Sequence, residues 1–316
     1  MLKNKAGILI LTLWSVSFLS LLLVILGYGI RQKISLVKRI QERPDYYLLA
    51  EPDIIKRIAS IKDLFHKEQI TLNDLNPNNF QPIISPQQNL IVEYYISDEQ
   101  AKLNINKVKP EILENLFLLL GLEEKKSKEL ASSIIDWRDS DSELSIPLGS
   151  AEDNFYRWQD FPYEAKDYDF EVLEELLLVK DMDQETFTKI KEYLTIYGDG
   201  RININTTDPL ILRALGIEKD LVDIIIEYRN GKDKLPFSSD DNFFEGNIAI
   251  LEKITSFKEI QPHQIERLSL IIEKYLTTNS SIFNISSVCK DKLHRKIAEV
   301  KAIVDREGKI ISFRRD

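Results

Sequence analysis

Carboxylates gathered in one short stretch are the residues of this sequence best placed to do chemistry. Asp139, Asp141 and Glu143 alternate along the chain, and Glu152 and Asp153 follow after a loop that contains a proline and a glycine. Alternate carboxylates in an irregular loop can converge on one point, where they repel one another unless a hard divalent cation is present. Because Ca²⁺ takes about six to eight oxygen ligands in flexible geometry, this spacing suits Ca²⁺ better than Mg²⁺.

The residues alone leave a second interpretation of this acidic loop open, namely a solvated surface loop without a ligand. The loop is not an EF-hand, because the sixth position counted from Asp139 is Leu144 rather than glycine and the twelfth is Ser150 rather than glutamate. Composition by itself slightly favours the solvated loop, and the choice between the two interpretations depends on the resemblance described below.

The acidic loop also sets the charge of the whole chain. The 316 residues include 42 Lys and Arg against 51 Asp and Glu, a net charge of −9. Between Asp136 and Glu185 there are 16 acidic and 4 basic residues, so this segment alone carries −12 and the remainder is slightly positive. Such a balance argues against a general binder of nucleic-acid backbones, which needs clustered Lys and Arg. The 43% apolar content is sufficient for a core and for two domains.

The sequence gives little support for a catalytic function. The three histidines, His66, His263 and His294, are isolated in the sequence, and no HExxH, GxSxG or phosphate-loop pattern occurs. The single cysteine, Cys289, has no partner for an intrachain disulfide or a thiolate zinc site. We therefore expect a protein that is not an enzyme.

The N-terminal segment has the length of a membrane helix. Twenty-three uncharged, mostly apolar residues run from Ile8 to Ile30, enough to cross the roughly 30 Å core of a bilayer. The seven residues before them, MLKNKAG, form a short basic leader that ends at Gly7. This layout predicts a prepilin leader cut between Gly7 and Ile8. An ordinary signal peptide or anchor is the alternative, and the four positive charges that closely follow the helix, against two before it, do not favour an outward C-terminus.

The remaining pattern predicts strands at both ends of a helical stretch. NLIVEYYIS predicts a strand, residues 110 to about 276 are mainly helical in pattern, and SIFNIS, IAEVKAIVDR and KIISFRR predict closing strands. The domains we expect are a leader at 1–7, a transmembrane helix at 8–30, a stalk helix with first strands at 31–106, an inserted helical domain at 107–277 and closing strands at 278–316.

The helical stretch contains an internal echo. KLNIN leads to Pro110, a helix, Gly121 and a second helix, and RININ leads to Pro209, a helix, Gly216 and a second helix. Each copy resembles a helix-hairpin-helix unit, a motif that commonly grips DNA phosphates, so a membrane-anchored DNA-binding or DNA-uptake protein is the rival hypothesis. A glutamate stands in each copy where the motif usually has its second glycine, and glutamate repels phosphate. We therefore expect no nucleic-acid partner.

Several of these segments together resemble the minor pseudopilin K of type II secretion systems, also called general secretion pathway protein K. The resemblance runs from Gly7 to about Gly231 and rests on the order of its motifs rather than on any one of them. These are the leader that ends in glycine, then ISDEQAKLNIN, IIDWRDSD, GSAEDNFY, Pro162-Tyr163, EVLEELLLVKDM and RININTTDPLILRALG.

The resemblance implies an α+β, type IV pilin-like fold, in which a long N-terminal membrane helix packs on a small antiparallel sheet and a large all-α domain is inserted. It implies a calcium-binding helical domain, processing by prepilin peptidase, and assembly with minor pseudopilins I and J at the tip of the pseudopilus. The chain would be a single-pass protein of the bacterial inner membrane with its C-terminal bulk in the periplasm. Thr12 stands where most type IV pilin-like proteins carry a glutamate, and this family typically lacks that acid.

Three features depart from the family pattern: Ile8 as first mature residue, a stalk interrupted by prolines, and DSDSE in place of adjacent acids. The last of these puts the role of Glu143 in doubt. The expected function is that of a non-enzymatic pseudopilin that helps initiate and cap a short filament for protein export. A generic anchored periplasmic protein is the alternative within membranes.

Overall fold

The structure is a computed structural model that describes residues 13–14, 16–23, 27–28, 30–31, 33, 51, 54–59, 65, 67, 70–85 and 90–315. The predicted processing site, Gly7 and Ile8, lies outside the described residues, as does part of the predicted membrane segment. The described residues of that segment are helical. Within the described part of the chain, no helix is long and apolar enough to cross a membrane.

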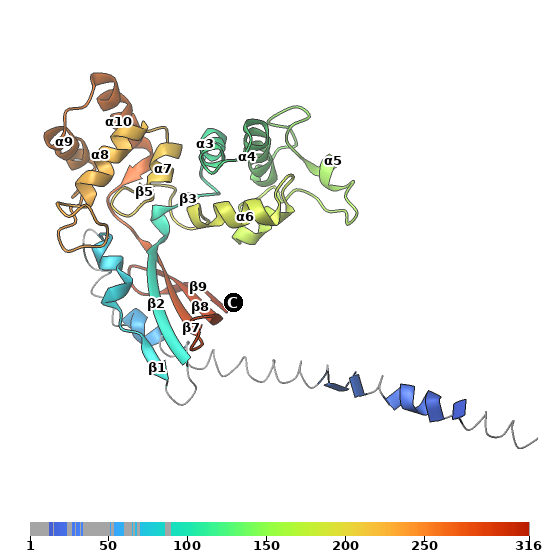
Figure 1. The fold of residues 1–316 in the computed structure, drawn as a ribbon. Coiled ribbons are helices and arrows are strands. Elements are labelled where there is room, and N and C mark those ends of the chain that lie inside the picture. Colours follow the sequence, from blue (N-terminus) through green and yellow to red (C-terminus); the bar gives the residue numbers. More distant parts are fainter. Residues whose placement is uncertain are drawn as a thin grey trace, which may run out of the picture.

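A five-stranded antiparallel sheet forms the base of the molecule (Figure 1). The order of its strands is β1-β2-β7-β8-β9, so the N-terminal strand β2 pairs directly with the C-terminal strand β7. The four predicted strands are confirmed in type and place. They are β2 (Leu90–Asp98), β7 (Ile282–Lys290), β8 (Lys296–Asp305) and β9 (Ile310–Arg315). The fifth strand, β1 (Ile83–Ser85), was not predicted, because it lies in a stretch rich in Pro and Asn that is typical of a loop.

One face of this sheet is covered by the segment that precedes it. Burial alternates strictly along β2, as expected for a strand with one face in a core. Ile54 and Ile58, from the helical residues 54–59, are buried against this face together with Phe65. The ring of Phe65 stacks on that of Phe283 in β7 at 4.8 Å between centroids. A helix therefore packs on the sheet just before the first strand, as the pilin-like interpretation expects.

The helical domain is inserted between β2 and β7 and consists of two units of the same design, which Figure 1 shows side by side above the sheet. The first comprises β3 (Leu103–Asn104), α3 (Pro110–Leu119), α4 (Glu124–Arg138), α5 (Asp153–Tyr156), the 3₁₀-helix η4 (Leu173–Leu178), α6 (Gln184–Ile190) and β4 (Leu194–Thr195). The second comprises β5 (Ile202–Asn203), α7 (Pro209–Ala214), α8 (Lys219–Arg229), α9 (Asn247–Phe257), α10 (Pro262–Tyr275) and β6 (Leu276–Thr277).

Each unit is closed by a parallel pair of two-residue strands. β3 pairs with β4, and β5 pairs with β6. Sequence periodicity indicates the helices but not these strands, because two residues are too few for an alternating pattern. The first residue of each of these strands is apolar and buried. These residues are Leu103, Leu194, Ile202 and Leu276.

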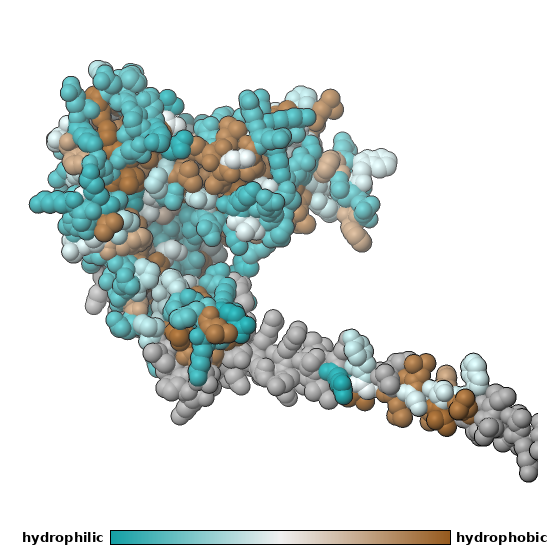
Figure 2. Space-filling model, in the orientation of Figure 1, coloured by the Kyte–Doolittle hydropathy of each residue, from teal (hydrophilic) through white to brown (hydrophobic). Residues whose placement is uncertain are grey.

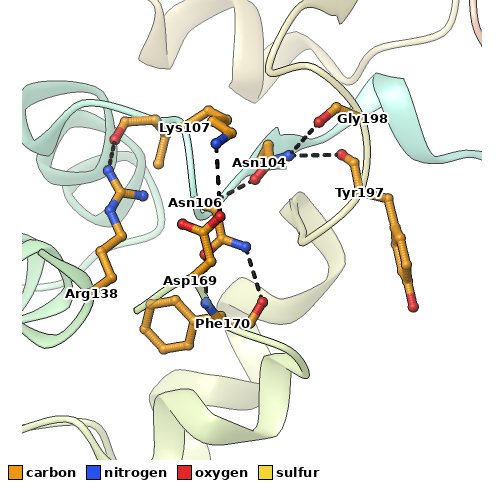
Figure 3. A network of polar contacts seen from close by, with 9 residues as sticks. Asn104, Asn106, Lys107, Arg138, Asp169, Phe170, Tyr197 and Gly198 are labelled. Atoms are coloured by element: carbon orange, nitrogen blue, oxygen red, sulfur yellow. Dashed lines mark hydrogen bonds and ion pairs between the residues drawn. The ribbon is translucent and has the colours of Figure 1, made fainter. Parts of the chain in front are cut away.

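The repeated Asn-Ile-Asn sequence performs the same task in both units. In the first, the Asn104 side chain donates to the carbonyls of Tyr197 and Gly198 and accepts from the backbone N–H of Asn106 (Figure 3). The Asn106 amide both donates to and accepts from the backbone of Phe170, as a strand neighbour would. These side chains satisfy backbone groups that a loop would otherwise leave unpaired.

The second unit repeats most of these contacts, except that the Asn203 amide donates to the Asp98 carboxylate and to Ser280 Oγ instead of to backbone carbonyls. The Asn203 side chain accepts from the backbone N–H of Asn205. The amide of Asn205 donates to the carbonyl of Phe244 and accepts from its N–H, as Asn106 does with Phe170. An arginine at the end of the second helix also donates to a loop carbonyl in each unit, Arg138 to Val108 and Arg229 to Thr207. The echo in the sequence is therefore an internal structural repeat.

The chain leaves the sheet and returns to it at one point, which is built around Asp98. Asp98 is the last residue of β2 and pairs in register with Phe283 of β7. Its buried carboxylate accepts hydrogen bonds from Asn203 Nδ2 at 3.1 Å, from Thr206 Oγ1 at 2.5 Å and from Ser280 Oγ. Burial raises the pKa of the Asp98 carboxyl, and the hydrogen bonds from these donors oppose the rise.

The two residues after Asp98 join the same junction to further elements. Glu99 accepts from Thr195 Oγ1 of β4 at 2.6 Å. The Gln100 side-chain oxygen accepts from both the backbone N–H and the hydroxyl of Ser281, just before β7. Three consecutive side chains therefore connect the sheet to both helical units and to the returning strand. We call Asp98, Glu99 and Gln100 the junction triplet.

Replacement of Asp98 by alanine should destabilise the whole fold. The substitution leaves one amide and two hydroxyl donors buried without their acceptor, which we expect to cost about 3 kcal/mol of unfolding free energy. Chemical denaturation of the full chain in detergent measures this. The matched control is Asp223→Ala, which removes an exposed pair with Lys219 and should cost less than about 0.5 kcal/mol. Equal losses in the two variants would contradict a structural role for Asp98.

Candidate metal site in the acidic loop

The acidic loop begins where α4 ends. Asp136 in the last turn of this helix is fully buried, and Asp139 caps the helix with its N–H bonded to the carbonyl of Ile135 at 2.9 Å. Residues three apart on a helix lie on one face. The first two carboxylates of the loop are thus directed to the same side by the helix itself.

The return of the loop brings Glu152 to this side. Glu152 immediately precedes α5 and is 5% exposed. One carboxylate oxygen of Glu152, Oε1, and one of Asp139, Oδ1, are buried without a hydrogen-bond partner in the structure. An unpartnered buried carboxylate oxygen is costly, so these two atoms are the strongest structural indication of a missing cationic partner.

Mutual repulsion is visible in the acidity of these groups. Burial, followed by the charges of Asp141 and Asp136, raises the pKa of Asp139 to about 6. Burial, followed by the charges of Asp136 and Asp139, raises the pKa of Glu152 to about 7. Asp167 adds to both shifts. Four carboxylates, Asp136, Asp139, Glu152 and Asp167, thus form one electrostatic group, which we call the acidic cluster.

The structure separates the five residues that the sequence singled out. Asp139 and Glu152 belong to the acidic cluster, and Asp141 is close enough to act on Asp139 but is exposed, with one oxygen accepting from the N–H of Glu143. Glu143 is also exposed. Asp153 lies in a different network, because its oxygens accept from Arg157 at 2.8 Å and from the backbone N–H of Ala165 at 3.0 Å.

Sequence reasoning missed Asp136 and Asp167. Asp136 could have been found, because it precedes Asp139 by one helical turn. Asp167 could not, because it reaches the cluster only through the folding of the loop after α5, where its N–H donates to the carbonyl of Trp137 at 3.1 Å. Among the described residues, no three His, Cys, Asp or Glu side chains form a group already arranged to hold a metal ion. The five-residue ligand set therefore remains a prediction.

Aromatic rings hold the backbone of this region. The ring of Trp137 meets those of Tyr156 and Tyr163 edge-on at 5.1 and 6.1 Å, and Tyr156 stacks on Tyr163 at 5.2 Å. Lys180 also donates to the carbonyl of Gly149 at 2.7 Å. The loop that carries the acids is consequently fixed at several points by groups other than the acids.

The loop after α8 in the second unit is also acidic but has a different chemistry. Glu152 to Tyr156 reads EDNFY, and Asp240 to Phe244 reads DDNFF, a likeness of sequence only, because the bonds of Phe244 with Asn205 match those of Phe170 with Asn106. The Asp240 carboxylate accepts from Ser238 Oγ and from the backbone N–H groups of Lys232 and Asp233, and these bonds lower its pKa. The protein itself therefore satisfies Asp240, whereas Glu152 in the first loop has a buried oxygen without a partner.

In both helix pairs, N–H groups of the turn between the helices donate to carbonyls of the preceding helix. The N–H groups of Gly121 and Leu122 donate to the carbonyls of Leu118 and Phe117. The N–H groups of Gly216 and Ile217 donate in the same way within the second unit. Both glycines have positive φ, +86° and +89°, so they serve to turn the chain between helices. These four amides of the two hairpin turns are therefore used internally here.

The fold defines a class: an α+β protein in which a two-unit helical domain is inserted into an antiparallel sheet that a preceding helix covers. GspK, in the crystal structure of the GspK-GspI-GspJ complex from the enterotoxigenic Escherichia coli type 2 secretion system, has a similar fold. The TM-score is 0.61 at 17% identity, and the match covers 90% of this chain and 98% of that one.

Sequence comparison matches part of the chain to one family. Residues 72–199 match the family described as type II secretion system (T2SS), protein K. The matched stretch includes β2, the junction triplet and the entire first helical unit, with the acidic cluster. The resemblance to the protein K family is thus confirmed over these residues, and most of the chain shares the fold of GspK. No curated protein sequence matches the chain.

The raised pKa values predict how stability changes with pH when no metal is present. The folded pKa values of Asp139 and Glu152, about 6 and about 7, lie above their unfolded values of roughly 4. The folded protein therefore binds more protons between about pH 4 and 7, and it loses stability as pH rises through this window. In chelator, Asp139→Asn should be nearly neutral at pH 4 and should melt higher than the unsubstituted chain at pH 8.

Melting of both full chains in detergent at the two pH values tests this. The control is Asp240→Asn, which removes an acceptor whose pKa is lowered and should therefore reduce stability at pH 8. If Asp139→Asn also reduced stability at pH 8, the carboxylate would not be under the repulsion described here.

Proposed function

We propose that this chain is the K-type minor pseudopilin of a type II secretion system, a non-enzymatic subunit that helps initiate and cap the pseudopilus. The observation that carries the proposal is the family match over residues 72–199. The fold shared with GspK supports it over most of the remaining chain.

The place of the helical domain supports a position at the filament tip. The junction triplet fixes both ends of the insertion at one end of the sheet, and the two units extend from there (Figure 1). In a filament built by packing N-terminal helices, a subunit with this bulk leaves no room for another headgroup directly above it. Thr12 is consistent with a terminal subunit, because it offers no charge to neutralise the N-terminal amine of a neighbour.

The partners we propose are minor pseudopilins I and J. GspK was crystallised with GspI and GspJ, and the same association is proposed for this chain. Prepilin peptidase would cut between Gly7 and Ile8, and residues 8–30 would hold the chain in the bacterial inner membrane as a single span with the C-terminal bulk in the periplasm. The type IV pilin-like fold is proposed with them, because residues 54–59 already pack as a helix on the sheet.

The bound ion we propose is Ca²⁺ at the acidic cluster. The fit is favourable because Asp139 and Glu152 each hold a buried oxygen without a partner and all four members are carboxylates, the ligand type that calcium prefers. Asp136, Asp139, Glu152 and Asp167 would hold the ion, with Asp141 and Glu143 near the opening of the loop. The ion would offset the repulsion and tie α4 to the loops on both sides of α5.

Calcium should stabilise the full chain. An ion that binds only the folded state adds about 2.7 kcal/mol at about a hundred times its Kd, which corresponds to a melting temperature roughly 5–10 °C higher. Calorimetry in detergent with calcium or with chelator measures the shift. Glu152→Gln should remove most of it, and Asp240→Asn, in the acidic loop of the second unit, should preserve it. If calcium left the melting temperature of the unsubstituted chain unchanged, the calcium proposal would be wrong, and the acidic loop would be a solvated surface loop without a ligand.

Processing and association test the pseudopilin proposal itself. Mass spectrometry of membranes should find a chain that begins at Ile8, and a strain without prepilin peptidase should retain Met1. When the full chain is co-expressed with the I and J pseudopilins of its own system, all three should co-purify in detergent. A chain that keeps Met1 in the competent strain and purifies alone would refute the proposal.

A further inference from the structure

The loops around α5 expose large apolar side chains to an unusual degree. Trp158 is 88% exposed and Phe161 is 87% exposed, and the neighbouring loop positions Leu148 and Tyr168 are 97% and 68% exposed. These loops lie at the outer end of the first unit, away from the second unit (Figure 1). Figure 2 shows that end as mainly hydrophilic, with pale and brown residues between the hydrophilic ones.

The turn that carries Trp158 and Phe161 is held in place from both sides. Arg157 binds Asp153 at 2.8 Å and Glu164 at 2.7 Å, so one guanidinium closes the turn across its base. Tyr163 follows the turn and donates its N–H to the carbonyl of Tyr156, on which its ring also stacks. The two exposed rings are therefore presented by an ordered backbone, and little conformational entropy is lost when they are covered.

Rigid exposed aromatic residues are characteristic of binding surfaces. Tryptophan and other aromatic anchors dominate the energetics of protein interfaces because they bury a large apolar area with few rotatable bonds. Trp158 and Phe161 are not part of the core of the first unit. The aromatic residues that pack there are Trp137, Tyr156 and Tyr163. The exposure of the two rings thus requires an explanation outside this chain.

The charge around the rings defines the kind of surface that can cover them. Residues 148–168, which form the loops around α5, include five acids and two bases. Both bases are engaged, because Arg157 and Lys166 are paired with glutamates. Asp160 and Glu164 flank Phe161 in the sequence and are exposed, and Glu164 is the one paired with Arg157. A partner must therefore bring positive charge of its own.

This charge argues against two other occupants. A second copy of this chain would bring the same excess of acid to the contact, and like charges placed opposite one another are unfavourable. An anionic lipid surface would be repelled for the same reason. Charge complementarity favours a protein surface with Lys and Arg around an apolar cleft.

We propose that the turn at residues 157–164 is a docking surface for a partner protein whose apolar cleft, rimmed by Lys and Arg, receives the Trp158 and Phe161 side chains. The inference goes beyond the proposed place in the pseudopilus and does not require the calcium ion. Affinity would come from the two rings, and the surrounding acids would make association sensitive to salt.

Site-specific photo-crosslinking in cells that make the full chain tests this surface. A benzophenone amino acid is placed at position 158, at 161, or at the control position of Ile248, which is 82% exposed on α9 of the second unit. Positions 158 and 161 should give the same discrete protein adduct, and position 248 should not. The adduct is then identified, and that protein is purified for binding measurements with the full chain in detergent.

The purified pair distinguishes a docking surface from chance proximity. Trp158→Ala should weaken binding by at least about tenfold, Ile248→Ala should leave it unchanged, and 500 mM salt should weaken it relative to 50 mM. Both variants should melt like the unsubstituted chain, since both side chains are exposed. The proposal is overturned by adducts to lipid or to a second copy, by no adduct at all, or by binding that Trp158→Ala or salt does not change.

Discussion

The architecture depends on a buried carboxylate at the place where the helical domain joins the sheet. Asp98 ends β2 and binds the side chains of Asn203, Thr206 and Ser280, which come from the second unit and from the returning chain. A buried charge is tolerated only when its hydrogen bonds are made. Their completion therefore fixes where the insertion leaves the sheet, where it returns and how the second unit is oriented. Glu99 connects the first unit to this junction, because it accepts a hydrogen bond from Thr195 of β4. Both units and the sheet therefore meet at three consecutive residues.

The two helical units use the same short sequence to satisfy backbone groups in their loops. A loop between helices must satisfy its backbone groups, and each unit does so with an Asn-Ile-Asn sequence whose amides act as substitute strand neighbours. The requirement explains why this short sequence is repeated although the helices between the copies differ in length. The units then diverge in the loop after the second helix, where the acids accept hydrogen bonds from different partners.

The sequence allowed four of the five strands of the sheet, most helices and the repeated segments to be predicted, because each depends on local pattern. The β-branched and aromatic run of β2, the closing strands and the glycine between paired helices were interpreted correctly, whereas β1 was not predicted. The two-residue strands and the junction around Asp98 could not be predicted, since they join residues about 75 to 180 positions apart. The acidic site was predicted in part for the same reason. Asp139 and Glu152 follow from local spacing, whereas Asp167 enters the cluster through a loop whose course only the fold determines.

The difference between the two acidic loops shows how one scaffold can carry two kinds of chemistry. In the second loop, Asp240 is enclosed by two backbone N–H groups and a serine hydroxyl, so its charge is stabilised by the protein alone. In the first loop, Glu152 faces other carboxylates, with one buried oxygen left unpartnered. A cation would offset this repulsion in the first loop, as proposed above, whereas the second loop satisfies its acid without one. An aromatic pair packs in each unit, Trp137 with Tyr156 in the first and Tyr228 with Phe244 in the second, so loops of different chemistry are carried by units of the same design.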